Sequence, residues 1–263
     1  MDEMPHDVVN FLENKFLVWC LVISRISGLF IVGPLFSTAF IPAIVKILII
    51  LFLSWLVTPS IESFIPLDTP IIEIFLMSLS NFIVGLLAGL IANALLTAVA
   101  HMGEIFGIQL GFGVAEVFDP QTMTQTPLVS QFTYLMAVYI FTLMKGPNMI
   151  LIAILKSFDD IPINFTDINF STFENIARIG SQIFRIGLRF GMPLVVFMVV
   201  VSFILGILSK LMPQMNIFMI GLPVKILVGL VLFAGVFPIL ADAITKLSFS
   251  IIGEVRELLT HLR

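Results

Sequence analysis

The stretch IFLMSLSNFIVGLLAGLIANALLTAVAHMG, residues 74–103, contains no aspartate, glutamate, lysine or arginine. A helix that crosses the ~30 Å hydrocarbon core of a bilayer needs about 20 predominantly apolar residues. The stretch exceeds this length, so it predicts a membrane-spanning helix that tilts, kinks or projects beyond the lipid. A helical integral membrane protein is the fold class that follows.

The remainder of the chain has the same character. Of its 263 residues, 59% are hydrophobic and 11% are charged, and the mean hydropathy is +1.13. A soluble domain carries about 25% charged residues, so this chain lacks the residues for a polar shell. Its apolar runs are long and continuous, unlike the short alternating strands of a membrane barrel. We therefore expect an all-α protein of helical hairpins with broken segments, forming one membrane-embedded domain over residues 1–263.

Six apolar segments predict long helices. They are residues 16–33, 43–57, 74–100, 132–155, 190–208 and 226–244. The excess of lysine and arginine between residues 156 and 189 and in the C-terminal tail favours cytoplasmic termini in a six-span topology. Arg25 stands within the first segment, and an arginine at the membrane centre costs about 2.5–3.5 kcal/mol on insertion scales. Such a residue needs partners.

The stretch KLMPQMNIFMIGLPVK, residues 210–225, separates the last two segments without becoming polar. Pro213, Gly221 and Pro223 predict a break in the helix there. Irregular backbone at membrane depth survives only where protein or a watery cavity satisfies its hydrogen-bonding groups. We expect a tight hairpin tip that packs on a neighbour.

The pattern of reactive side chains excludes several function classes. The net charge is −4 with no basic stripe, which argues against nucleic-acid binding. Cys20 is the single cysteine, so neither a disulfide framework nor a thiolate metal cluster is expected. No catalytic motif, no nucleophile–base pair and no cluster of histidines stands out. The expectation is a protein without enzymatic activity, cofactor or metal.

The stretch HMGEIFGIQLGFGVAEVFDPQ, residues 101–121, combines glycines with large apolar side chains. Gly107, Gly111 and Gly113 disfavour a long regular helix, since each glycine costs up to ~1 kcal/mol relative to alanine. Bulky apolar side chains on a flexible backbone can close a pore by dewetting. The residues alone leave two interpretations open, a channel gate or a glycine-kinked end of a span with an amphipathic connection.

Four motifs in this order resemble one family over nearly the whole chain. They are RISGLFIVGPLF at residues 25–36 with Pro42 and Lys46, GEIFGIQLGFG at 103–113 with Asp119 and Pro120, KGPNMILIAILKSFDDIP at 145–162, and KLMPQMNIFMIGLPVKI at 210–226. The chain resembles FliR, the export-gate component of bacterial flagellar type III secretion, and its SctT counterparts in virulence secretion systems. The flagellar branch is the expected one.

The resemblance implies a function and a set of partners. FliR-like proteins pack as hairpins in a shallow spiral with FliP and FliQ, engage FlhB, and pass unfolded flagellar proteins. The implied location is the bacterial inner membrane at the flagellar basal body, in contact with lipid and with part projecting to the periplasmic side. Sister subunits are the expected source of partners for Arg25, Glu104 and Asp119. The alternative is a secondary transporter for a small solute, which predicts paired helix interruptions in two related halves; no such symmetry stands out.

The resemblance also implies the site residues. The family's glycine-rich loop plugs the channel, and it falls on residues 105–112 of this chain, with Glu104 and Gln109 as its polar positions. The expected plug residues are Glu104, Ile105, Phe106, Gly107, Ile108, Gln109, Leu110, Gly111, Phe112 and Gly113. The expected structural or subunit-contact residues are Arg25, Gly28, Pro42, Asp119, Pro120, Pro213, Gln214, Phe218, Gly221 and Pro223.

Overall fold

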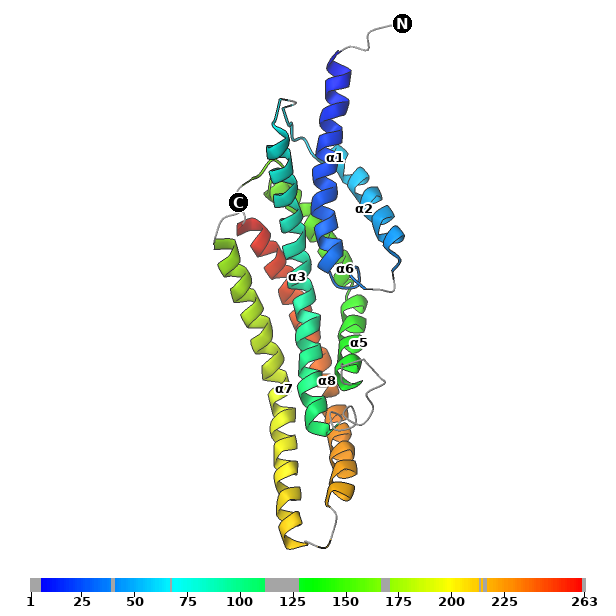
Figure 1. Ribbon diagram of the computed structural model, residues 1–263, viewed down its shortest axis with the longest axis vertical. Helices are drawn as coiled ribbons and strands as arrows, with labels where there is room; N and C mark the ends of the chain where they lie inside the picture. The colour runs from blue at the N-terminus through cyan, green and yellow to red at the C-terminus, as the bar shows by residue number, and fades with distance from the viewer. Residues whose placement is uncertain are drawn as a thin grey trace. The chain divides into compact units, whose positions relative to one another are not determined.

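The computed structural model describes residues 6–38, 41–66, 68–111, 128–166, 171–212, 214 and 217–261. Over these residues the chain forms helices and no strand, which confirms the predicted all-α fold (Figure 1). In chain order the elements are α1 (His6–Val32), α2 (Ala43–Val57), the 3-10 turn η1 (Thr58–Ser60), α3 (Ile71–Leu110), α5 (Leu128–Leu143), α6 (Gly146–Asp160), α7 (Ser171–Leu211) and α8 (Ile217–His261).

The lengths and composition of the helices confirm an integral membrane protein. Within the described residues, five helices are long and apolar enough to cross a membrane, and the pair α5–α6 makes a sixth when it counts as one span. The predicted segment at residues 43–57 coincides with α2. The predicted segment at 132–155 is not one helix, because the chain breaks at Lys145, which adopts a left-handed conformation with φ of 57°. Pro147 then lies in the first turn of α6, where its missing N–H costs nothing.

Two predicted interruptions are shorter than expected. α3 continues to Leu110 and therefore includes Gly107, which the sequence analysis placed in a non-helical loop. α8 begins at Ile217 and includes Gly221 and Pro223. A glycine or proline within a helix costs a few kcal/mol at most. Backbone N–H and C=O groups left unpaired at membrane depth cost more, so an apolar helix continues through such a residue.

The chain divides into two compact units. The first consists of Met1–Ala94, Lys145–Gly180 and Phe249–Arg263, and the second of Leu95–Met144 and Ser181–Ser248. The two units are defined by the contacts within each of them. One membrane-embedded domain over the whole chain stays a prediction.

In the first unit, α1 lies beside α2 and crosses α3 at very short range (Figure 1). A Cβ atom at Gly85 of α3 would overlap the carbonyl oxygen of Arg25, and one at Gly28 of α1 would overlap that of Phe82. Small residues of this kind let two membrane helices approach backbone to backbone. The buried cluster of the first unit consists of Val18, Leu21, Val22, Ile26, Phe30, Ile61, Ile65, Met77 and Ile163.

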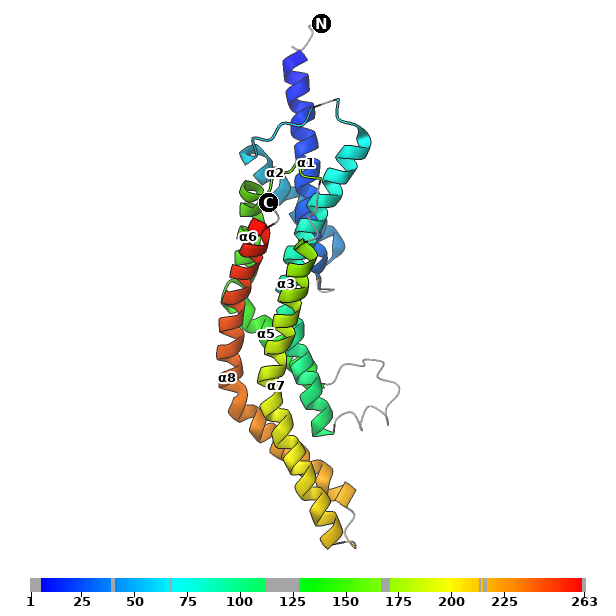
Figure 2. The ribbon, with the colours of Figure 1, turned by 90° about the vertical axis from the view of Figure 1, so that its left-hand side faces the viewer.

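In the second unit, the C-terminal part of α3 packs against α5, α7 and α8. Gly103 of α3 faces Thr133 of α5, and Gly191 of α7 faces Met102 of α3. Phe106 of α3 stacks on Phe233 of α8 with ring centroids 5.7 Å apart. Farther along, α7 and α8 run together as an antiparallel pair toward the turn near Gln214 (Figure 2).

Candidate channel plug and its buried supports

The last turn of α3 has one anchored face and one free face. Phe106 and Leu110, four residues apart and hence on one side of the helix, are both fully buried. Ile105 and Ile108 are 37% and 59% exposed. We call Ile105 and Ile108 the plug face. The helical half of the predicted plug therefore presents apolar side chains outward from a fixed base.

The base of the plug face is built by α8. The Phe106 ring stacks on Phe233, and Phe132 of α5 meets the same Phe233 ring edge-on at 6.0 Å between centroids. Leu110 occupies the space that a side chain at Gly229 would fill. No sequence motif marks Phe233 or Gly229, which lie more than a hundred residues from the predicted plug.

Gly111 ends the helix. Its φ is +91°, and its N–H donates to the carbonyl oxygen of Ile108 at 3.0 Å. Residues with a side chain rarely adopt such a conformation, so glycine is the residue that allows the chain to leave α3 at this point. Gln109 is half-buried and Gly107 is buried. Phe112, Gly113, Asp119 and Pro120 lie outside the described residues, so the rest of the predicted plug stays a prediction.

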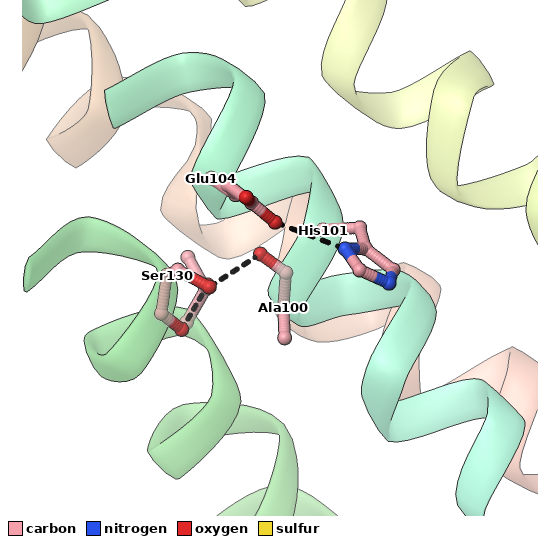
Figure 3. Close-up of polar contacts among 5 residues, drawn as sticks. Ala100, His101, Glu104 and Ser130 are labelled. Atoms are coloured by element: carbon pink, nitrogen blue, oxygen red, sulfur yellow. Dashed lines mark hydrogen bonds and ion pairs between the residues drawn. The ribbon is translucent and has the colours of Figure 1, made fainter. Parts of the chain in front are cut away.

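Glu104 directly precedes Ile105 of the plug face and contacts its own helix. Its Oε2 lies 3.0 Å from Nδ1 of His101, and both side chains are about half exposed (Figure 3). Beside them, the Ser130 hydroxyl of α5 donates to the carbonyl oxygen of Ala100 at 2.9 Å. The partner that the structure gives Glu104 is thus a neighbour on α3, whereas the sequence suggested a sister subunit.

Arg25 is a fully buried cation inside the first unit. Its Nε donates to Asn81 Oδ1 at 2.9 Å, and its Nη1 donates to the carbonyl oxygen of Ser157 at 2.9 Å. Nη2 donates to the carbonyl oxygen of Ile161 at 3.1 Å, and the guanidinium carbon lies 4.4 Å from the centroid of the Phe158 ring. The expectation that sister subunits supply its partners is therefore corrected, since they come from α3 and α6 of the same chain.

The position of Arg25 explains how the fold tolerates a charge without a carboxylate. Ser157 in the last turn of α6 and Ile161 directly after it mark the C-terminal end of the helix, where the helix dipole favours a cation and the carbonyl oxygens can accept its N–H groups. Asn81 is held in turn, because its Nδ2 donates to the carbonyl oxygens of Met77 and Ile163 at 2.7 and 2.8 Å. These partners were missed from the sequence, since no spacing rule links residues so far apart.

The remaining predicted residues fall in different places. Pro42 is exposed and precedes α2, and its carbonyl oxygen accepts the N–H groups of Val45 and Lys46. Gln214 is exposed in the turn after α7, Gly221 is buried in α8, and Pro223 is exposed in α8. Phe218 belongs to α8, but its side chain lies outside the described part, as does Pro213.

Comparison with known proteins identifies the family of the chain. The model of the family described as bacterial export proteins, family 1, matches residues 16–250. The chain belongs to this family. The resemblance on which the sequence analysis relied is thereby confirmed, and the apolar helices fit a membrane protein of bacterial export.

Relatives of the same family are flagellar proteins by name. The flagellar biosynthetic protein FliR of Bacillus subtilis (strain 168) is 34% identical over 233 residues, which cover 85% of this chain and 87% of the relative. The protein of the same name from Pectobacterium carotovorum is 30% identical over 262 residues, covering 93% and 97%. That from Escherichia coli (strain K12) is 26% identical over 240 residues, covering 90% and 91%.

Proposed function

We propose that the chain is a non-enzymatic subunit of the flagellar type III protein export gate. In this proposal it assembles with FliP and FliQ, engages FlhB, and lies in the bacterial inner membrane at the flagellar basal body. The plug face and the residues after Gly111 close the conduit through which unfolded flagellar proteins pass. The names of the relatives and the family match support the flagellar assignment.

The proposal of a plug rests on the contrast in exposure between the two faces of the last turn of α3. Phe106 and Leu110 are buried, while Ile108, two residues from each, is 59% exposed. Apolar side chains that project from a firmly seated helix can exclude water from a narrow passage, and dewetting of this kind closes pores. Gly111 then provides the backbone freedom by which the following residues can change direction.

The exposed surface supports assembly with other membrane subunits. Most side chains of α2 and of the second half of α7 are apolar and exposed within this chain. In a monomer these faces would contact only lipid, and in a complex they can pack on sister helices. A secondary transporter would use a charge buried in the membrane to bind its solute, whereas the charge of Arg25 is already engaged by hydrogen bonds inside the chain.

Substitution of the plug face by Ile105→Ser and Ile108→Ser tests the proposal. The complex is co-expressed with FliP and FliQ, purified and reconstituted into vesicles, and the leak of small ions is measured. Two hydroxyls in place of two apolar side chains stabilise water in the constriction, so we expect the leak to rise about tenfold or more. A deletion is a less sharp test, because residues 107–110 also hold the base of the helix.

Leu135→Ser is the matched control. Leu135 lies on α5 of the same unit and is 54% exposed, close to the exposure of Ile108. The control should leave the leak unchanged, and all variants should co-purify with FliP and FliQ. A tight membrane in the double variant, with assembly intact, would show that the plug face does not seal a passage. A chain that neither FliP nor FliQ retains would contradict the assembly itself.

A further inference from the structure

An apolar groove between α1 and the end of α2 has a volume of about 420 Å³. Its walls are Phe11, Leu12, Lys15, Phe16 and Trp19 from α1, and Trp55, Thr58 and Pro59 from α2 and η1. Pockets for lipid-like or drug-sized ligands have volumes of about 300–1,000 Å³ and combine apolar walls with a few polar groups. The groove lies within the first unit and takes no part in the plug.

Lys15 is the one cation in the wall of this groove. Its Nζ donates to the carbonyl oxygen of Ile61 at 3.0 Å and lies 5.9 Å from the centroid of the Phe11 ring. Across the part of the chain that the structure describes, no carboxylate reaches this ammonium group. A half-buried ammonium without an anion, beside apolar walls, has the chemistry of an anion receptor at the edge of a membrane.

Both tryptophans of the chain line the groove. Trp55 is 67% exposed, and Trp19 packs against Phe16 with ring centroids 5.9 Å apart. Tryptophan gathers at membrane–water interfaces, because the ring is apolar and the indole N–H is polar. The buried Nε1 of Trp19 has no acceptor among the described residues, which leaves a donor in the wall without a partner.

We infer that this groove binds one phospholipid, with an acyl chain along the aromatic walls and the phosphodiester against Lys15. The apolar walls match the acyl chain, and the Lys15 ammonium, which has no carboxylate partner among the described residues, matches the phosphodiester charge that all common phospholipids carry. Next to it, Asn14 and Lys15 both donate to carbonyl oxygens of the segment after η1, at Ile65 and Ile61, so non-helical backbone lies beside the groove. The site marks the level at which the α1–α2 hairpin meets the lipid–water interface. It does not depend on the proposed function.

A sister helix is the competing occupant of the groove, and it differs from a phospholipid in one respect. An apolar helix has no phosphodiester and would leave the Lys15 ammonium without an anion. Lipid bound through Lys15 therefore requires the charge, whereas a packed helix requires the shape alone.

Fluorescence quenching tests the site, because the two tryptophans report directly on the groove. The full chain in detergent micelles is titrated with limiting phosphatidylethanolamine brominated on its acyl chains, and with the matching brominated diacylglycerol, which lacks the phosphodiester. We expect saturable quenching by the phospholipid at least fivefold stronger than by the diacylglycerol. Lys15→Met should remove this advantage, and Lys15→Arg, which keeps the charge, should retain it.

Lys46→Met is the matched control. Lys46 is also half-buried in a helix of the first unit and also donates its Nζ to a carbonyl oxygen, that of Thr38 at 2.9 Å, but it does not line the groove. The tryptophan fluorescence of Lys46→Met should be quenched by each lipid to the same extent as that of the unaltered chain. Equal quenching by the two lipids, equal binding in Lys15→Met, or no quenching in the unaltered chain would overturn the inference. Loss of quenching in the complex with FliP and FliQ, with quenching in the chain alone, would show that a helix fills the groove and would also overturn it.

Discussion

Replacement of Arg25 by methionine should destabilise the first unit strongly. Methionine fills a similar volume without donors, so the change isolates the hydrogen bonds from the packing. Asn81 Oδ1 and the carbonyl oxygen of Ile161 would lose the donors that they have in the structure. The carbonyl oxygen of Ser157 would keep one donor, the N–H of Ile161 at 2.9 Å.

The magnitude follows from the two groups left without a donor. A buried polar group without a partner costs about 1–3 kcal/mol, so two such groups cost about 2–6 kcal/mol. Loss of a cation from the C-terminal end of α6 adds about 0.5 kcal/mol, and relief from burying a charge offsets part of the total. We expect a decrease of about 3 kcal/mol in the free energy of unfolding. For a chain of this size that lowers the midpoint of thermal unfolding by about 6–12 °C.

The assay is thermal unfolding of the purified protein in detergent micelles, with two companion variants. Arg25→Lys keeps the charge near the carbonyl oxygens but loses the planar fork, so its loss should be about half as large. Lys46→Met removes a half-buried lysine whose Nζ donates to the carbonyl oxygen of Thr38, and it should cost about 1 kcal/mol or less. If Arg25→Met and Lys46→Met lower the midpoint equally, the hydrogen bonds of Arg25 do not stabilise the first unit to the extent predicted.

Two further substitutions test the packing. Gly85→Ala places a methyl group against the backbone of α1 and should cost about 3 kcal/mol in thermal unfolding, whereas Gly206→Ala, where the added atom meets open space, should cost nothing; equal midpoints would deny the close crossing. Phe233→Ala removes the ring on which the plug helix stacks and should cost about 3–5 kcal/mol, with faster amide hydrogen exchange over residues 104–110. Phe203→Ala, at a side chain 69% exposed, should change neither, and unchanged exchange in Phe233→Ala would show that α8 does not hold the plug.

The sequence predicted the helices well, because apolar length is a local property. The segment at residues 43–57 and α2 agree at both ends, and the segments at 74–100, 190–208 and 226–244 each lie within one described helix. The segment at 16–33 extends one residue past α1, and the segment at 132–155 is divided between α5 and α6. The prediction from sequence was wrong where the conformation of a single residue determines whether a helix continues. Gly107 was expected in a non-helical loop and lies within α3, while Lys145 breaks a helix although no rule marks a lysine for that role. The following Gly146 and Pro147 were the available signal.

The site could be predicted only in part, because its supports come from distant segments. The motif around residues 103–113 pointed to the proposed plug, and the isolated charge of Arg25 indicated that partners were needed. Asn81 and Ser157 could not be named, since their positions follow from how α3 and α6 pack on α1. Likewise, Ile108 and Leu110 look equivalent in sequence, and only the packing of α8 separates the exposed side chain from the buried one.

Cross-linking from the plug face to an exported chain tests the central claim most directly. With the single native thiol removed by Cys20→Ser, a new thiol at Ile108→Cys or at Leu135→Cys is placed in the assembled complex. An export substrate arrested in transit carries one cysteine within the conduit, and disulfide formation is measured. The account predicts a cross-link from position 108 and none from position 135. Cross-linking from 135 but not from 108 would contradict it.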